Sequence, residues 1–121
     1  MTEYPLRNYL SQKNWTFSPI NTPRNIPNRD LLREGFCFQE LYQRRCVKKV
    51  LKDITRFFKN NGCTVKKQLL PGNAGLFYVT KKGVDRKIDI VYNLPEGERN
   101  LRVGVFSPPR VYEQIVGLES S

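Results

Sequence analysis

Apolar residues between positions 44 and 60 recur at the i, i+3, i+4, i+7 spacing that is typical of an amphipathic helix. The following Asn60-Asn61-Gly62 indicates a helix C-terminus, because glycine readily adopts the left-handed conformation that ends many helices. The apolar face comprises Val47, Val50, Leu51, Ile54, Phe57 and Phe58, and the opposite face comprises Arg44, Arg45, Lys48, Lys49, Lys52, Arg56 and Lys59. Asp53, at the margin, is the only acid. The pattern predicts one long helix that packs on a core and presents a row of cations.

After Gly62 the period of the pattern changes to about two residues, which is typical of half-buried strands. Four short segments rich in Val, Ile, Leu, Phe and Tyr are predicted strands: 63–70, 76–81, 87–94 and 101–106. Because their connections are short, they must pair as an antiparallel meander. A short C-terminal helix is predicted after Ser107-Pro108-Pro109, where Val111, Ile115 and Leu118 align.

The first 35 residues differ from the rest of the chain, since prolines interrupt every period and asparagine recurs. The prolines are Pro5, Pro19, Pro23 and Pro27. We expect an extended N-terminal arm, with a single helical turn over 28–35. On the long helix, Phe36, Phe38, Leu41 and Tyr42 would point away from its apolar face. Either the helix starts near Tyr42 or, as we favour, the arm covers its first turns. Trp15 and Phe17 fit two alternatives equally well: they plug the edge of the core, or they dock on a partner.

These elements together predict an α+β fold. One long amphipathic helix packs on a four-stranded antiparallel β-meander, with a short C-terminal helix and an extended N-terminal arm. Residues 1–35 form the Pro/Asn-rich arm, and residues 36–121 form a single basic α+β domain.

Charge narrows the class of partner. The 121 residues include 21 Lys and Arg against 11 Asp and Glu, for a formal charge of +10. An excess of this size favours an anionic partner, which means nucleic acid (DNA or RNA), an acidic protein surface or, more weakly, an anionic membrane surface.

The sequence offers few residues for catalysis or metal binding. The chain has no histidine, so a serine or cysteine nucleophile lacks its usual base, and we expect no enzyme. The three cysteines, Cys37, Cys46 and Cys63, have no zinc-site or disulfide spacing, and neither a metal nor another cofactor is expected. Free thiols and a start without a signal-peptide pattern predict an intracellular protein, nuclear or cytoplasmic. No motif of a known family is identified.

The leading hypothesis is a non-catalytic protein that contacts nucleic-acid phosphates through its basic helix face. Lys81, Lys82, Arg86 and Lys87 add further cations on strands and turns. The predicted contacts are Arg44, Arg45, Lys48, Lys49, Lys52, Arg56, Lys59, Lys66 and Lys67.

The alternative hypothesis is a protein–protein adaptor or assembly subunit, viral or nuclear, that uses the N-terminal arm and an exposed sheet edge. Its predicted partner-binding residues are Trp15 and Phe17. Ser18 and Thr22 each precede a proline and are candidate phosphorylation sites beside the basic domain. A homodimer through the sheet edge or the long helix is compatible with either hypothesis.

Overall fold

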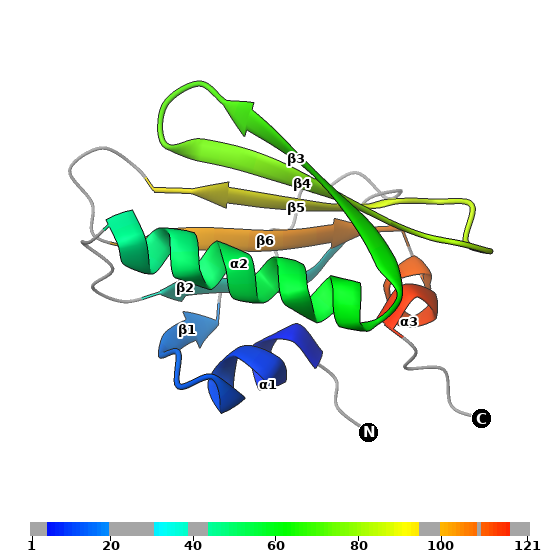
Figure 1. Cartoon of the computed structure of the whole chain (residues 1–121), viewed down its shortest axis with the longest axis horizontal. Coiled ribbons are helices and arrows are strands. Elements are labelled where there is room, and N and C mark those ends of the chain that lie inside the picture. The colour runs from blue at the N-terminus through cyan, green and yellow to red at the C-terminus, as the bar shows by residue number, and fades with distance from the viewer. Residues whose placement is uncertain (1–4, 20–30, 39–43, 95–99, 109, 117–121) are drawn as a thin grey trace.

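The computed structural model describes residues 5–19, 31–38, 44–94, 100–108 and 110–116. A six-stranded antiparallel sheet with strand order β1-β2-β6-β5-β4-β3 forms its centre, and three helices accompany it (Figure 1). The predicted four-stranded meander with one long helix is therefore wrong, whereas the α+β class with an antiparallel sheet is confirmed. The elements are α1 (Pro5–Gln12), β1 (Phe17–Pro19), β2 (Leu31–Phe38), α2 (Arg44–Asn60), β3 (Cys63–Leu70), β4 (Ala74–Lys81), β5 (Ile88–Asn93), β6 (Leu101–Ser107) and α3 (Val111–Val116).

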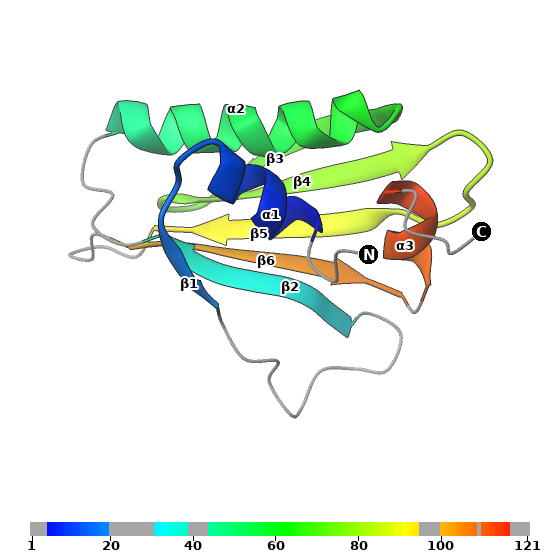
Figure 2. The ribbon, with the colours of Figure 1, turned by 90° about the horizontal axis from the view of Figure 1, so that it is seen from below.

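Helices and strands form two layers. α1 and α2 lie side by side on the same face of the sheet, and α3 lies at the end of the sheet where β6 finishes (Figures 1 and 2). α2 buries the apolar face that its periodicity predicts: Val50, Ile54 and Phe58 have no exposed surface. The helix ends as expected, because the Gly62 N–H donates to the Lys59 carbonyl at 3.1 Å and Gly62 has φ +78°. Among the described helices, none is long and apolar enough to cross a membrane.

Strands β3 to β6 lie close to the predicted segments, and three of them have clear alternation. On β5, Ile88, Ile90 and Tyr92 are buried while the residues between them are partly exposed. On β4 and β6, every second residue is likewise buried against the helices. β3 is the exception, since it lies at the edge of the sheet and buries only Cys63.

The N-terminal segment is not an extended arm. Leu6 and Leu10 of α1 are fully buried, and α1 packs against both α2 and β2. Phe17 of β1 contacts Phe36 of β2 with ring centroids 5.1 Å apart. Leu6 and Leu10 therefore belong to the core and Phe17 packs against it. β2 lies inside the sheet, between β1 and β6. The predicted boundary between residues 35 and 36 falls within β2.

The helical turn predicted over 28–35 is wrong for the part that the structure describes, since residues 31–35 belong to β2. Phe36 and Phe38 are also in β2 rather than in the long helix, which begins at Arg44. Residues 28–30 and 39–43 lie outside the described residues. A register shift between Leu32 and Glu34 breaks the period-two alternation, and this bulge conceals the strand in the sequence.

A buried carboxylate explains the unusual sequence of β2. Glu34 is 1% exposed, yet it faces the core, where its carboxylate accepts hydrogen bonds from the backbone N–H groups of Leu6 (3.2 Å) and Arg7 (2.9 Å). These N–H groups belong to the first turn of α1 and have no partner within the helix. The Tyr112 hydroxyl of α3 donates to the same carboxylate. Glu34 therefore caps α1 from another element and joins α1, β2 and α3.

Candidate functional site

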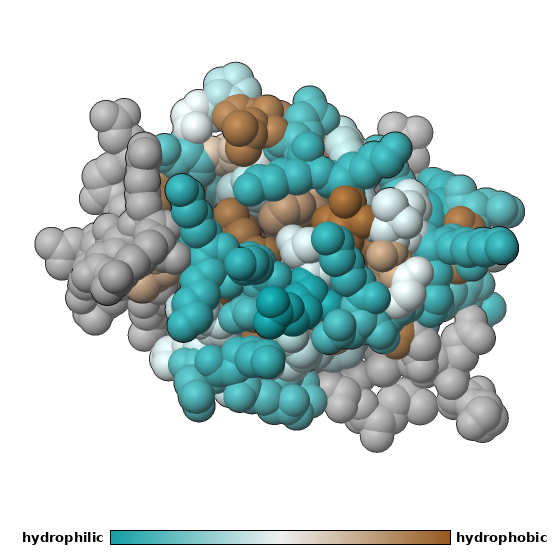
Figure 3. Space-filling model, viewed as in Figure 1, coloured by the Kyte–Doolittle hydropathy of each residue, from teal (hydrophilic) through white to brown (hydrophobic). Residues whose placement is uncertain are grey.

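The outward face of α2 carries a continuous row of cations. Figure 3 shows hydrophilic side chains gathered over α2, which crosses the front of that view. We call this set the α2 cation row; its members, all exposed, are Lys48, Lys49, Lys52, Arg56 and Lys59. Arg44 and Arg45 form the start of α2, and their side chains lie outside the described residues.

The one acid of α2 does not neutralise this row. Asp53 is half-buried on the side of α2 that faces α1, and its Oδ2 accepts a hydrogen bond from the Trp15 indole N–H at 2.8 Å. The ion pairs of the described residues join Arg7 to Glu34, Arg33 to Glu113 and Lys87 to Asp89, and none of them involves α2.

The predicted strand cations are divided between the two faces of the sheet. Lys66 pairs in register with Tyr78 on the face away from α2, whereas Lys67 pairs with the buried Phe77 on the helix-bearing face. The Lys67 ammonium lies 5.9 Å from the Phe77 ring centroid. Of these two lysines, only Lys67 therefore shares a side of the sheet with the α2 cation row.

The other strand and turn cations are partly engaged in the fold. The Lys81 ammonium donates to the Ile115 carbonyl at 3.0 Å, which satisfies a carbonyl in the last turn of α3. The Lys87 ammonium lies 3.4 Å from Asp89 and 3.9 Å from the ring centroid of Tyr78. Lys82 and Arg86, between β4 and β5, are exposed.

Trp15 and Phe17, the predicted partner-binding pair, both pack on the core. The Trp15 ring lies edge-on to Phe38 with centroids 6.0 Å apart, and Phe17 contacts Phe36 and Phe38 at 5.1 and 5.6 Å. Both side chains are half-buried. This placement corresponds to the first of the two sequence-based alternatives, in which the pair plugs the edge of the core.

No family model, curated protein or solved structure matches this chain. Among the described residues, no three His, Cys, Asp or Glu side chains come together as a metal-binding group. Cys37 and Cys46 are half-buried and Cys63 is buried. Burial raises the pKa of the Cys63 thiol above its usual value, although the charge of Lys81 lowers it in part.

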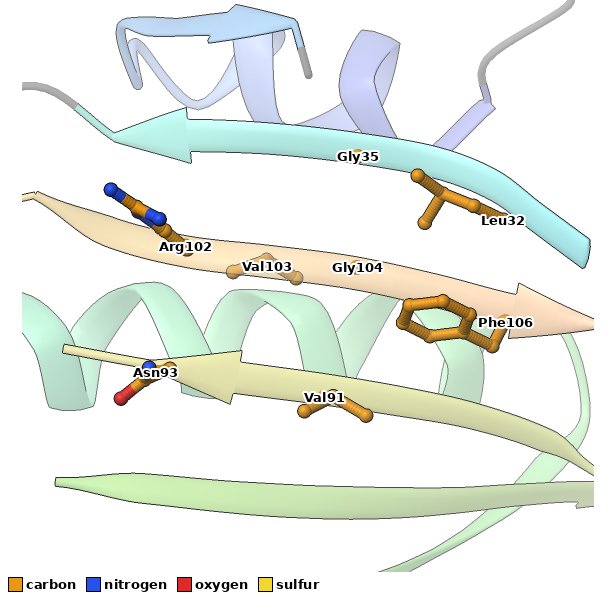
Figure 4. A pocket seen from close by; sticks show the side chains of 8 residues that line it. All are labelled: Leu32, Gly35, Val91, Asn93, Arg102, Val103, Gly104 and Phe106. Atoms are coloured by element: carbon orange, nitrogen blue, oxygen red, sulfur yellow. The ribbon is translucent and has the colours of Figure 1, made fainter. Parts of the chain in front are cut away.

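An apolar hollow lies on the face of the sheet that is opposite α1 and α2. Gly35 of β2 lies directly across from Gly104 of β6, so neither strand contributes a side chain there, and a hollow of about 210 Å³ results. Figure 4 shows Leu32 and Phe106 at one end of it and Arg102 at the other. Because α1 and α2 lie on the opposite face of the sheet, a ligand in this hollow would not contact the α2 cation row.

A second, polar hollow adjoins the α2 cation row and was not predicted. It lies between the end of α1 and α2, has a volume of about 500 Å³, and is lined by Lys13, Asn14, Trp15, Lys49 and Asp53. We call it the Trp15 hollow. The sequence contains one signal for it: Asp53 is the only acid on a cationic helix, which indicates a specific contact.

Proposed function

We propose that this protein binds nucleic acid without catalysis, through phosphate contacts along the α2 cation row. The observation that carries the proposal is a row of five exposed cations with no acidic partner among the described residues. Positive charge arranged in this way attracts a phosphate backbone, and contacts to phosphates position a protein without selecting a base sequence.

The row works against the stability of the helix that carries it. Lys48, Lys52 and Arg56 follow one another at four-residue intervals, so neighbouring cations are about 6 Å apart along the helix axis. Like charges at this spacing destabilise a helix by roughly 0.2–0.5 kcal/mol per pair, whereas a merely solvated helix gains from mixed signs. An anionic partner would remove this repulsion, and this supports a binding role over simple solvation.

The dimensions of the row suit a polyanion. From Lys48 to Lys59 it extends over about 16 Å of helix. Duplex DNA carries one negative charge for about every 1.7 Å of its axis, so several phosphates lie within reach of a surface of this length.

The test is a double charge reversal, Lys52→Glu with Arg56→Glu. Binding would be measured by fluorescence anisotropy of labelled single- and double-stranded DNA and RNA at two salt concentrations. We expect wild-type affinity to fall steeply with salt, and the variant to bind at least about tenfold more weakly, because two phosphate contacts become repulsive.

The matched control is Lys82→Glu with Arg86→Glu, which reverses one lysine and one arginine in the exposed turn between β4 and β5. Two reversals change the charge by 4, so both variants carry +6 in place of +10. Equal losses in the two variants would show that net charge, and not the α2 cation row, determines binding. No binding to any nucleic acid at low salt would refute the proposal.

A protein–protein adaptor remains the second candidate, on the evidence of one sheet edge. β3 is an edge strand, and its Leu69 is 76% exposed. An unpaired edge can accept a strand from a partner. Pull-down of an acidic protein that is abolished by Leu69→Lys, but withstands K52E/R56E, would favour this candidate over nucleic acid.

A further inference from the structure

The Trp15 hollow combines an aromatic ring with two cations. Trp15 is half-buried and lines the hollow, while Lys13, in the turn after α1, and Lys49 of α2 are exposed at it. Its volume of about 500 Å³ falls within the range of pockets that hold small ligands.

The indole is fixed before any ligand binds. Its N–H donates to Asp53 Oδ2 at 2.8 Å, and its ring lies edge-on to Phe38 at an interplanar angle of 79°. The backbone is held as well, since the Trp15 N–H donates to the Leu10 carbonyl at 3.2 Å and Asn14 has φ 67°. A ring held in this way loses little conformational entropy when another ring stacks on it.

The charge at the hollow is positive. Asp53 is its only acid, and one of the two carboxylate oxygens already accepts the indole N–H. Lys49 forms no ion pair among the described residues, and the Lys13 ammonium lies 5.4 Å from the ring centroid of Tyr9. Two ammonium groups beside one engaged carboxylate favour an anion.

We propose that the Trp15 hollow holds one unstacked nucleotide of a bound single strand. The base stacks on the indole, and the adjoining phosphate lies between Lys13 and Lys49. This inference rests on the proposed function and adds a preference to it, because a single strand offers an unstacked base whereas a duplex must first unpair one. Stacking tolerates any base, so no sequence preference is expected from this contact.

Trp15 is the only tryptophan in the chain, so its fluorescence reports directly on the hollow. The full chain would be titrated with unlabelled (dT)12, with an abasic backbone of the same length, with a 12-base-pair duplex and with inorganic phosphate. We expect (dT)12 to quench the emission. The abasic backbone and the duplex should bind with little quenching, and inorganic phosphate should leave the emission almost unchanged.

The variant pair Lys13→Gln with Lys49→Gln tests the phosphate contact. Its matched control is Lys48→Gln with Lys59→Gln, which removes the same charge from α2 away from the hollow. In wild type we expect (dT)12 to bind at least about fivefold more tightly than the abasic backbone. K13Q/K49Q should lose most of that ratio, because the two lysines meet the phosphate of a nucleotide whose base is stacked in the hollow, and an abasic site has no base to bring its phosphate there. K48Q/K59Q should weaken both oligonucleotides alike and keep the ratio.

The outcomes separate this inference from the proposed function. If anisotropy shows binding but (dT)12 neither quenches Trp15 nor binds more tightly than the abasic backbone, the inference fails and the proposed function stands. Equal quenching by inorganic phosphate would reduce the hollow to a simple anion site and would also overturn the stacking. If anisotropy shows no binding of any oligonucleotide, both proposals fail together.

Discussion

At the scale of single residues, the Glu34 carboxylate has the most unusual environment in the described chain. Burial raises its pKa from the ordinary 4.5 to about 7, while the backbone N–H groups of Arg7 and Leu6 and the charge of Arg7 lower it against that trend. The three groups that donate to it come from α1 and α3, far away in sequence. A glutamate inside the strand LLREGFCF therefore serves as the junction of three elements.

The raised pKa predicts that the protein loses stability as the pH rises. Between pH 4.5 and about 7 the folded state holds a proton on Glu34 that the unfolded state has lost, so the free energy of unfolding should fall across that window. The size of this loss is roughly 3 kcal/mol, and urea unfolding at pH 5 and pH 8 would measure it.

Glu34→Gln should abolish most of this pH dependence, because glutamine does not titrate. Glu113→Gln is the control: it breaks the partly buried ion pair with Arg33, whose atoms lie 2.6 Å apart, but leaves Glu34 in place, so the wild-type trend should persist. A wild-type protein as stable at pH 8 as at pH 5 would contradict the assignment of a buried, proton-binding carboxylate.

At the scale of elements, the N-terminal segment is part of the core, because α1 and β2 pack against the rest of the fold. α1 fills the space beside α2 on the helical layer, and its Leu6 and Leu10 have no exposed surface. Removing residues 1–30 would therefore expose the core. Loss of binding by such a truncated protein would reflect damage to the fold, so it could not distinguish an adaptor from a nucleic-acid-binding protein.

Leu10→Ala should lower the free energy of unfolding by about 2–5 kcal/mol, because it removes a fully buried side chain and leaves a cavity. The same substitution at Leu69, which is 76% exposed, should change it by no more than about 0.5 kcal/mol. Urea unfolding of the two variants compares them directly. A small effect at Leu10, equal to that at Leu69, would mean that α1 does not pack on the core in solution.

At the scale of the whole molecule, the described cations lie on both faces, and their longest row lies on the helical layer. The α2 cation row and Lys13 lie on the helical layer, while the other face of the sheet carries the apolar hollow, the cations Lys66 and Arg102, and the Lys87–Asp89 ion pair. The exposed cations of the described residues are thus densest on the side of α2. A polyanion approaching the protein would be oriented toward α2.

The number of phosphate contacts should appear in the salt dependence of binding. If each of the five row cations meets one phosphate, the slope of log K against log salt is about −4 to −5 for duplex DNA and about −3 to −4 for a single strand. K52E/R56E should reduce the slope by about 2 for a duplex. Anisotropy titrations over a series of salt concentrations measure it, and a slope near zero would exclude phosphate contacts as the source of affinity.

The sequence by itself determined the elements whose patterns are local. The helix at Arg44–Asn60, its cationic face and the strands from Cys63 to Ser107 follow from periods of 3.6 and 2 residues, because each pattern is complete within its own segment. The same alternation already places the adjacent Lys66 and Lys67 on opposite faces of β3, so their separation was readable in the sequence.

Only the tertiary structure decided the role of the N-terminal third. Strand β2 contains an inward glutamate, a glycine and a bulge, and nothing within the strand compensates for burying the carboxylate. The groups that stabilise its buried residues are the first turn of α1, the Tyr112 hydroxyl and the Phe17 ring of β1, all contributed from elsewhere in the chain. The Trp15 hollow likewise exists only because α1 ends beside α2. Contacts between distant segments leave no periodic signal in the sequence, so they can be identified only from the tertiary structure.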